Sequence, residues 1–418
     1  MFRKLVSLKP YPSRWAYTNI QSFGDRLKTP DVLIIGAGIV GLSIAKSLLE
    51  QNSDLQVKVI EKESSLGLHA SGRNSGVLHA GFYYSPDSLK ARFCKEGNLA
   101  LRSLCKENDI EVHNLGKIVV SKNEGEDQLL EQLFNRGISN GVELELLEKE
   151  QLFDLEPLAK THSRFIWSPT TAVADPQAVI KVLANKVKSL GGEIIFDRSF
   201  NIKEDYSGKD SRHVVNASGS QADRIAKSFG FGNQFSMIPF MGLYRYVPKS
   251  KLPLKRLVYP VPNPQNPFLG VHFTISASGS VKIGPTAIPL LNREQYSLLE
   301  NWNLSDIKES VRGLTSMLKG NAHDLPGLFK AEFPKFFESQ LIKESSQLVP
   351  NVSGVTGWKK MRPGIRAQLI DINTGQLVSD FLVEGDKCST HVLNAVSPGW
   401  TAALPFGKYI ADRVISHL

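Results

Sequence analysis

A glycine-rich turn near the start of the chain restricts the fold more than any other feature of this sequence. Gly36, Gly38 and Gly41 form the pattern G-x-G-x-x-G, directly after the short apolar run 31–35. An amphipathic helical segment begins at Gly41, and a second apolar run follows at 57–60. A strand, a turn, a helix and a strand in about thirty residues predict a βαβ unit that binds a dinucleotide.

Each glycine of this turn has its own predicted role. Gly36 permits the tight turn, Gly38 lets backbone N–H groups approach a pyrophosphate, and Gly41 lets the helix pack closely against the strand. Ile39 and Val40 lie where the helix begins, and its free N–H groups attract phosphate. We therefore expect all five residues to contact the cofactor.

The end of the second strand predicts which part of the nucleotide is held there. Glu61 comes 20 residues after Gly41, where a carboxylate accepts hydrogen bonds from a ribose 2′-OH. A carboxylate also disfavours the extra phosphate of NADP, and Lys62 beside it is a further expected contact. The motif alone does not separate FAD from NAD.

The polar loop 64–81 favours FAD. Its small and hydroxylated residues let backbone and side-chain donors reach phosphate or flavin oxygens. The expected cofactor contacts in this loop are Ser71, Arg73, Asn74 and Ser75.

Composition excludes several other classes of protein. The 50 basic residues exceed the 41 acidic ones, which suits a dinucleotide and an acidic substrate. No basic run has the length or the interleaved aromatics of a nucleic-acid-binding segment, so no nucleic-acid partner is expected. The 3 cysteines have no C-x-x-C spacing, so no metal site is expected. No apolar stretch approaches the ~20 residues that span a bilayer.

The N-terminal extension 1–30 is basic. Its first 24 residues contain four basic residues, serines and aromatics, and the first acid is Asp25. This composition predicts a mitochondrial presequence. A basic tail of a cytoplasmic protein is the alternative.

The order of apolar runs predicts an α/β fold, with an α+β second domain. Helix and strand patterns occupy both ends of the chain, whereas alternating strands and proline-rich turns occupy 236–284. We expect a Rossmann-like FAD-binding domain that holds a discontinuous, β-rich substrate domain. The expected FAD-binding segments are 31–113, 163–236 and 352–418, and the expected substrate segments are 114–162 and 237–351.

Four phenylalanines cluster in a helical region of the second domain. Phe329, Phe333, Phe336 and Phe337 are expected to face a core or a partner helix. A patch for peripheral membrane association is the alternative, although basic residues intervene.

The run from His69 to Ala91 resembles the L-2-hydroxyglutarate dehydrogenase/oxidase family of the FAD-dependent, D-amino-acid-oxidase-like oxidoreductases. The resemblance extends over nearly all of 31–418. Further similar segments are 173–179, 214–219, 259–262, 267–272, 284–287, 363–368 and 393–399.

The resemblance implies FAD as the cofactor and oxidation of L-2-hydroxyglutarate to 2-oxoglutarate by hydride transfer to flavin. It also implies two later FAD contacts. These are the strand and turn that end at Gly219, and the turn formed by Pro398, Gly399, Trp400 and Thr401. Some relatives attach FAD covalently through this first loop, where His69 lies; we expect non-covalent FAD.

Three candidates for catalysis follow from the same family-like segments. Histidine suits the base role because its ordinary pKa of ~6.5 lies near working pH. His272 is the favoured base and His79 a flavin-side or substrate-orienting group, although either could be structural. Arg366 is the favoured carboxylate clamp, since guanidinium binds carboxylate through two hydrogen bonds. Arg73 and Lys90 are weaker candidates.

Some positions depart from the family pattern and leave other substrates open. Met241 and Leu243 replace an arginine and an acid, and Trp400 replaces a small residue. The alternatives are an amino-acid or amine oxidase, another 2-hydroxy-acid dehydrogenase, and a non-catalytic FAD-binding assembly protein. Thr286 and Tyr244 are expected to complete a dicarboxylate pocket. No nicotinamide site is visible, so electrons must leave to quinone, a protein carrier or oxygen.

Overall fold

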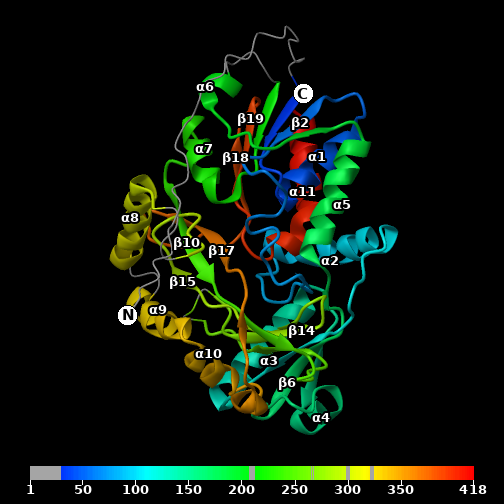
Figure 1. The fold of residues 1–418 in the computed structure, drawn as a ribbon, viewed down its shortest axis with the longest axis vertical. Helices are drawn as coiled ribbons and strands as arrows, with labels where there is room; N and C mark the ends of the chain where they lie inside the picture. Colours follow the sequence, from blue (N-terminus) through cyan, green and yellow to red (C-terminus); the bar gives the residue numbers. More distant parts are fainter. Residues whose placement is uncertain (1–29, 207–211, 265, 267, 298–301, 321–323) are drawn as a thin grey trace, which may run out of the picture.

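The computed structural model describes residues 30–206, 212–264, 266, 268–297, 302–320 and 324–418. The predicted N-terminal presequence therefore lies outside the described residues, apart from Pro30. Figure 1 shows a long molecule with helices gathered around one sheet at the top and a larger sheet at the bottom. Among the described helices, none is both long and apolar enough to cross a membrane.

The upper part is built on a six-stranded sheet in the order β18-β19-β9-β1-β2-β8. The pairs along β19, β9, β1, β2 and β8 are parallel, and β18 runs antiparallel to β19. The strands are β1 (Val32–Ile35), β2 (Val57–Ile60), β8 (Glu193–Ile195), β9 (His213–Asn216), β18 (Leu382–Gly385) and β19 (Ser389–Asn394).

Alternate residues of β1 serve two different cores, which explains why the strand is apolar throughout. Val32 and Ile34 belong to the cluster under the helical layer. Leu33 and Ile35 belong to a smaller cluster on the opposite face, which α7 (Ala222–Ser228) and the segment from Phe200 to α6 (Ile202–Asp205) help to cover.

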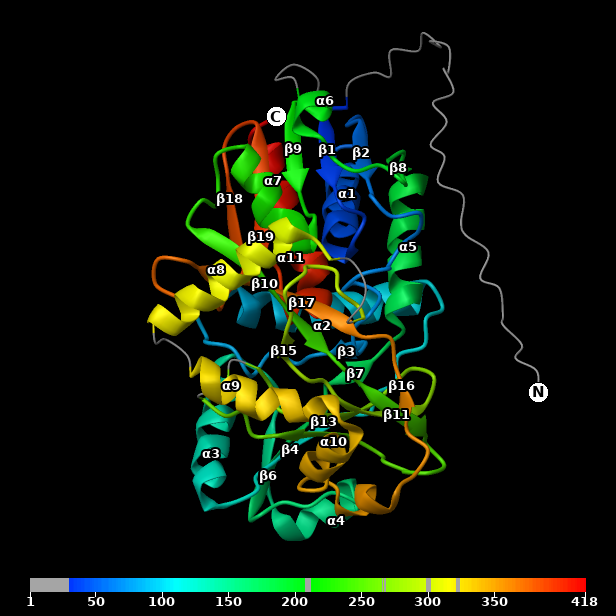
Figure 2. The same cartoon turned by 60° about the vertical axis from the view of Figure 1, so that its left-hand side comes forward.

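The helical layer consists of four helices that pack against one another, with α1, α5 and α11 beside the sheet and α2 at its lower end (Figures 1 and 2). They are α1 (Ile39–Gln51), α2 (Leu89–Glu107), α5 (Pro176–Ser189) and α11 (Gly399–Ile415). A Cβ on Gly407 of α11 would lie 2.5 Å from the Cβ of Ser43, so glycine allows α11 to approach α1 closely. Helices from near the start and from the end of the chain, α1 and α11, thus pack in the same layer.

The lower part is an eight-stranded sheet in the order β16-β11-β14-β13-β12-β4-β6-β5. Its strands are β4 (Lys117–Val120), β5 (Glu145–Glu148), β6 (Arg164–Ser168), β11 (Arg245–Pro248), β12 (Leu257–Pro260), β13 (His272–Ile275), β14 (Ser280–Gly284) and β16 (Lys359–Lys360). The helices of this part are α3 (Glu124–Ser139), α4 (Leu152–Leu155) and α10 (Glu338–Ser345), with the 3-10 helices η1 (Lys149–Gln151), η3 (Phe333–Phe336) and η4 (Pro350–Gly354). Between the two parts, α8 (Leu304–Gly320) packs on β10 and α9 (Leu325–Glu332) contacts β15 and η3.

Two smaller sheets connect these parts. β10 (Phe235–Gly242) pairs along its whole length with β17 (Gly364–Asp371) and at its end with β15 (Ile288–Pro289). β3 (Val77–Leu78) pairs with β7 (Ala172–Val173). Figure 2 shows β10 and β17 passing between the upper and lower sheets.

The predicted fold class is confirmed: a Rossmann-like domain is combined with a discontinuous β-rich second domain. The domain boundaries stay a proposal. Sheet membership favours two adjustments to them, because β6 and β16 lie in the eight-stranded sheet although the expected boundaries at 163 and 352 assign them to the FAD-binding domain.

The prediction that the four clustered phenylalanines face a core is wrong for three of them. Phe333 is 50% exposed, Phe336 40% and Phe337 66%. The 3-10 turn η3 places Lys335 inside instead, where it pairs with Glu332. Phe329 is half-buried and stacks on Phe333.

Candidate functional site

The glycine-rich turn brings β1, β9 and α1 together through close backbone contacts. Gly36 has φ +103°, and a Cβ there would lie 2.7 Å from the carbonyl oxygen of Ala217. A Cβ on Gly41 would collide with the carbonyl oxygen of Gly36. Both positions therefore exclude larger residues on steric grounds.

The N-terminus of α1 keeps its donors close to the loop predicted to contact the cofactor. Gly38 caps the helix without a side-chain hydrogen bond. The N–H of Ile39 donates to Ser71 Oγ at 3.0 Å, and Val40 is half-buried beside it. Ile39 and Ser71 are both predicted to contact the cofactor, and this hydrogen bond joins the 64–81 loop to the start of α1.

The carboxylate of Glu61 also bonds to backbone groups. Its two oxygens accept from the N–H groups of Ala37 (2.9 Å) and Glu63 (3.0 Å). Lys62 bridges Glu63 and Glu294 at 2.6 and 2.7 Å. The end of β2 is thus connected to the turn before α1 and to the segment after β15.

His69 lies in the same network. Its Nδ1 lies 2.6 Å from Tyr296 Oη, and its Nε2 lies 2.8 Å from Glu63 Oε1. Glu63, His69 and Glu294 lie close enough together to share a cation, but Lys62 already supplies an ammonium to both carboxylates. The expectation of no metal site stays a prediction.

The remaining contacts predicted in this loop shape it or reach the neighbouring domain. The guanidinium of Arg73 lies 3.9 Å from the ring centroid of Tyr296, and its Nη1 donates to Pro363 O at 3.4 Å. Asn74 donates to two carbonyls of the loop and accepts from Gly76 N. Ser75 is half-buried beside it.

The second predicted turn forms the start of α11. Pro398 is the N-cap and Gly399 the first helical residue, and a Cβ on Gly399 would meet no described atom within 4 Å. Trp400 is 9% exposed within the main apolar cluster, which accounts for an indole at this position, and its Nε1 has no hydrogen-bond partner among the described residues. Thr401 Oγ1 donates to Val77 O at 3.1 Å.

Gly219 has φ +59° and begins the short 3-10 helix η2 (Gly219–Gln221) after β9. A Cβ there would meet no described atom within 4 Å, so the position is open although its backbone conformation favours glycine. The group that fits this set of features is a dinucleotide. Uncapped N–H donors at Gly38, open glycines at 219 and 399, and the carboxylate of Glu61 supply donors for phosphate and an acceptor for ribose.

The predicted base lies on one face of the eight-stranded sheet. β4 and β12 run parallel with Lys117 opposite Leu257, so Lys117 and Tyr259 share a face. The rings of Tyr259 and His272 stack with their centroids 3.9 Å apart. Thr274 follows His272 by two residues and has the same orientation. We call Lys117, Tyr259, His272 and Thr274 the substrate face.

His272 is held as a neutral imidazole with a defined tautomer. It is 5% exposed, and its Nδ1 lies 2.8 Å from the carbonyl oxygen of Gly270. A carbonyl only accepts, so Nδ1 carries the proton and Nε2 carries the lone pair. Burial lowers the pKa of His272 to about 3; the carbonyl of Gly270 opposes this shift, and the charges of Arg366 and Lys117 add to it.

The loop after β3 positions His79 through its backbone. Its N–H donates to Thr401 Oγ1 at 3.2 Å, and its carbonyl accepts from Asn98 Nδ2 at 3.1 Å. The buried Nδ1 of its ring has no hydrogen-bond partner in the described part of the chain. Burial lowers the pKa of His79 well below its usual value, and the proximity of Lys117 and His272 lowers it further.

Arg366 lies on β17 with its guanidinium 5.6 Å from the ring centroid of Phe268. Its charge acts on His272 and opposes the rise that burial causes in the pKa of Tyr244. The structure therefore brings His79 and Arg366 within electrostatic reach of His272, which is buried, whereas His79 and Arg366 are half-buried.

Other predicted pocket residues already have partners within the protein. Thr286 donates to Met241 O and accepts from Leu243 N, both at 3.0 Å, so backbone groups occupy its hydroxyl. Met241 itself lies in an apolar cluster. Lys90 is buried at the start of α2, where burial lowers its pKa to about 8 and the carboxylate of Asp380 opposes that shift.

Sequence reasoning missed Lys117. The available signal was a lysine at the start of the otherwise apolar run 117–120. Its side chain is fully buried. Burial lowers the pKa of Lys117 to about 7, and the thiol of Cys94 opposes the shift.

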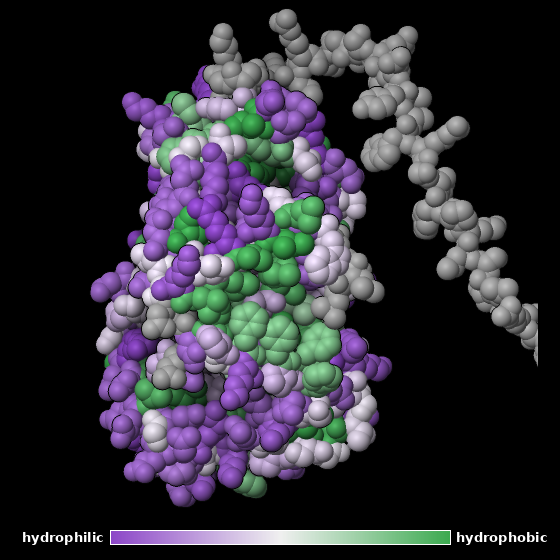
Figure 3. Space-filling view, turned by 90° about the vertical axis from the view of Figure 1, so that its left-hand side faces the viewer, coloured by the Kyte–Doolittle hydropathy of each residue, from purple (hydrophilic) through white to green (hydrophobic). Residues whose placement is uncertain are grey.

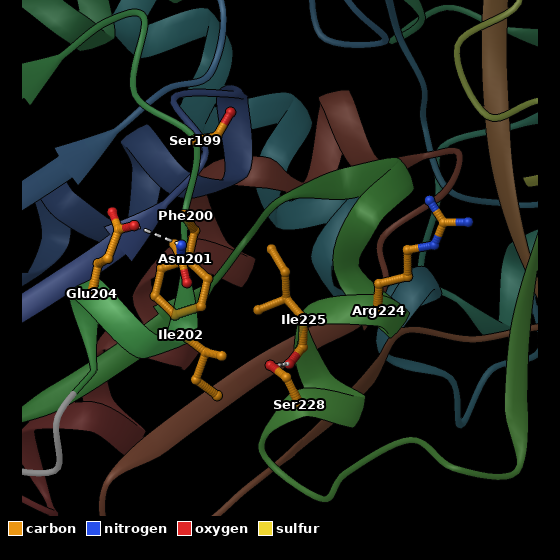
Figure 4. A pocket seen from close by; sticks show the side chains of 8 residues that line it. All are labelled: Ser199, Phe200, Asn201, Ile202, Glu204, Arg224, Ile225 and Ser228. Carbon is orange, nitrogen blue, oxygen red and sulfur yellow. Dashed lines mark hydrogen bonds between the residues drawn. The ribbon is translucent and has the colours of Figure 1, made fainter. Parts of the chain in front are cut away.

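A surface hollow of about 490 Å³ lies between the start of α6 and α7 (Figure 4). Several of its polar side chains bond locally: Asn201 Nδ2 donates to Glu204, and Ser228 Oγ donates to Ile225 O. None of the described residues that line it is a predicted cofactor or catalytic residue.

The family described as FAD dependent oxidoreductase matches residues 31–413 of this chain. The chain is also similar to an L-2-hydroxyglutarate dehydrogenase of Salmonella houtenae, with 34% identity over 92% of this chain and 93% of that protein. The mitochondrial L-2-hydroxyglutarate dehydrogenase of Dictyostelium discoideum is 34% identical over 98% of this chain and 96% of that protein.

Among solved structures, the chain is similar to the FAD-bound L-alpha-glycerophosphate oxidase from Mycoplasma pneumoniae. The TM-score is 0.72 at 22% identity, covering 93% of this chain and 95% of that one. At this identity the likeness shows the shared fold.

Proposed function

The chain belongs to the family of FAD-dependent oxidoreductases, and on that premise we propose that it oxidises L-2-hydroxyglutarate to 2-oxoglutarate. The observation that carries this proposal is the similarity, over nearly the whole chain, to L-2-hydroxyglutarate dehydrogenases of both bacteria and eukaryotes. FAD is the cofactor.

The residues that would hold FAD are those of the glycine-rich turn, the 64–81 loop and the start of α11. Glu61 would accept from ribose, and the N–H groups at Gly38 and Gly399 would donate to phosphate or flavin oxygens. Both ring nitrogens of His69 contact protein groups, which supports non-covalent FAD. When bound, FAD supplies the acceptor for the hydride that leaves the hydroxyl carbon.

The substrate hydroxyl must also lose a proton. The lone pair on His272 Nε2 can accept it, because the carbonyl of Gly270 holds the ring proton on Nδ1. Proton uptake is favoured once a substrate carboxylate lies nearby, since an anion raises the pKa of an adjacent imidazole.

Arg366 and His79 would orient the substrate. The guanidinium of Arg366 would bind the carboxylate next to the hydroxyl carbon, close to the base. The ring Nδ1 of His79 has no hydrogen-bond partner among the described residues and would be free to contact the substrate, from a loop that Thr401 joins to α11. Burial of this group excludes water, which strengthens each of these interactions.

The electron acceptor is proposed to be a quinone or a protein carrier at a membrane surface. Leu304, Val311 and Leu318 recur every seven residues on α8 and are exposed, like the three phenylalanines at η3. Figure 3 shows an apolar region across this side of the molecule, with hydrophilic residues on both sides. Exposed basic residues of the same helices are Lys308, Arg312, Lys319 and Lys330. A mitochondrial location is part of this proposal; "mitochondrial" appears in the names of eukaryotic relatives.

The test of the proposed reaction is the flavin absorbance of the purified protein under anaerobic conditions. L-2-hydroxyglutarate should bleach it, and 2-oxoglutarate should form in equal amount. Bleaching by glycine or a D-amino acid instead would indicate an amino-acid oxidase. A flavin that no hydroxy or amino acid reduces would indicate a non-catalytic FAD-binding protein.

The proposed membrane contact has a separate test, which is flotation with vesicles that contain anionic lipid. The protein should float with them, and the double variant Leu304→Asp and Leu318→Asp should not, while its flavin is still bleached by substrate. Flotation that the double variant retains would assign membrane binding to another surface.

A further inference from the structure

Lys117 has the surroundings of an ion-binding group. It is 0% exposed in the middle of the eight-stranded sheet. Its Nζ lies 4.3 Å from the ring centroid of Phe82, 4.5 Å from that of Tyr83 and 4.9 Å from that of Tyr259. The faces of three aromatic rings thus surround one ammonium.

Such a cage stabilises a cation but does not satisfy its hydrogen bonds. Each ring attracts the ammonium only weakly, whereas removing a charge from water is costly unless the charge is paired. An ammonium has three N–H donors, and Lys117 Nζ has no acceptor within the described residues. What it lacks is a negatively charged group with several acceptor oxygens.

The neighbouring side chains point to the same missing group. Tyr83 Oη and Thr274 Oγ1 are also buried without hydrogen-bond partners in the described part of the chain. Thr274 lies on the substrate face two residues after His272, in the row of residues that crosses the sheet from Lys117 through Leu257. Hydroxyl donors and an ammonium together suit a carboxylate.

We propose that Lys117 binds the distal carboxylate of the substrate and thereby selects a 2-hydroxy diacid over a 2-hydroxy monoacid. This inference rests on the proposed function. His272 is influenced by two cations, more strongly by Arg366 than by Lys117. The substrate carboxylate next to the hydroxyl carbon must lie near the base, so we assign it to Arg366. The distal substrate carboxylate is then assigned to Lys117.

This assignment also fits the position of Met241, where the family resemblance led us to expect an arginine. Met241 packs among Ile288, Leu290 and Ile365, so that position offers no charge to a substrate. Lys117 supplies the second cation from a different strand.

The experiment compares two substrates in wild type and in Lys117→Met, which preserves the apolar stem and removes the charge. The substrates are L-2-hydroxyglutarate and L-2-hydroxypentanoate, which lacks the distal carboxylate. The kcat/KM for the diacid should fall roughly 10²–10³-fold, mainly through KM. The kcat/KM for the monoacid should stay within about threefold or rise, because no anion is lost from its complex.

Lys90→Met is the matched control, because Lys90 is another buried lysine with a lowered pKa but lies with Asp380. It should leave the preference for the diacid within about threefold of wild type. An equal loss for both substrates in Lys117→Met, or an unchanged preference, would overturn the inference. A fall in kcat alone would do so too, since it would indicate a chemical role for Lys117.

Folding is checked by the FAD content and the thermal melting of each variant. Lys117→Met should melt at or above the wild-type temperature, because an unpartnered buried charge has gone. If it does not retain FAD, Lys117→Gln gives the same comparison, with the same expected loss for the diacid. Wild type that fails to oxidise L-2-hydroxyglutarate refutes the proposed function, whereas wild type that oxidises it without preference over the monoacid refutes only the role of Lys117.

Discussion

The nucleotide part and the substrate part of the candidate site are built from different kinds of groups. The nucleotide part consists mainly of backbone groups and glycines that are close together in the sequence, such as Gly36, Gly38 and Gly41. The substrate part consists of side chains from β4, β12, β13 and β17, which are far apart in the sequence. In the first part most side chains already bond to backbone; in the second, His79, Lys117 and Thr274 each keep a buried polar atom without a partner among the described residues.

This difference teaches where each part is vulnerable. A backbone cradle fails when a side chain intrudes, because the close approach of chain segments is lost. In a face of buried polar side chains, a substitution should lower the reaction rate or the substrate affinity before it disrupts the fold, because replacing one polar side chain leaves the backbone in place. The four predictions below test that distinction, from the largest effect to the smallest.

Gly41→Val should abolish FAD retention. Its side chain would collide with the carbonyl of Gly36 and force α1 away from β1. The measurement is the flavin absorbance of the purified protein after gel filtration. Gly354→Ala is the control, because a Cβ there would meet no described atom within 4 Å, and it should retain FAD. A full flavin spectrum in Gly41→Val would show that this close approach is not needed.

His272→Ala should retain FAD but reduce flavin ~10²–10⁴-fold more slowly, the range lost with a general base. The measurement is anaerobic stopped-flow reduction by L-2-hydroxyglutarate. His162→Ala is the control, because His162 is 46% exposed and pairs with Asp127. A rate within tenfold of wild type would move the base elsewhere, with His79 next to be tested.

The sequence predicted the βαβ unit of the nucleotide part because its physics is local. The spacing of the glycines, the position of Glu61 and the apolar runs each depend on neighbouring residues, and the βαβ unit formed where they indicated. The observed strands and helices differ from the expected ranges by only a few residues.

The substrate part was predicted only in fragments. His272 and Arg366 were found through family-like segments, but nothing in the sequence shows that β4 lies beside β12, which brings Lys117 to the same face. The exposure of Phe333, Phe336 and Phe337 was mispredicted for a similar reason. Whether these apolar side chains are buried depends on which way they point, and the 3-10 geometry of η3 points them differently from an α-helix.

Binding of the diacid should weaken as the pH rises above about 7. Lys117 titrates near there in the free protein and must be charged to bind a carboxylate, so the affinity for glutarate should fall roughly tenfold per pH unit. The other titratable groups around it should keep one protonation state from pH 6.5 to 9. The pKa values of His79 and His272 are lowered, and those of Cys94, Tyr83, Tyr84 and Tyr259 are raised.

The measurement is a titration of wild type with glutarate, followed by the change in flavin absorbance at several pH values. In Lys117→Met the affinity should be lower at neutral pH and should not vary over this range. A pH dependence of equal slope in both proteins would assign the titration to another group.

Asn98→Ala should have the smallest effect and the most direct bearing on how the substrate part is supported. Asn98 is buried on α2, and its Nδ2 donates to the carbonyls of Leu78, His79 and Thr170 at 3.0, 3.1 and 3.2 Å. Alanine leaves these carbonyls without that donor, which should lower the free energy of unfolding by about 1–3 kcal/mol.

The loop that carries His79 should then lose its fixed position, so kcat should fall by about tenfold, with FAD still bound. The control is Asn108→Ala, which removes one hydrogen bond to Leu104 O outside the site and should cost about 0.5–1.5 kcal/mol with no change in kcat. Denaturant unfolding and steady-state kinetics on both variants measure the two effects. A loss of stability in Asn98→Ala with unchanged kcat would mean that His79 is held by Thr401 alone, and that α11 rather than α2 positions this side of the substrate.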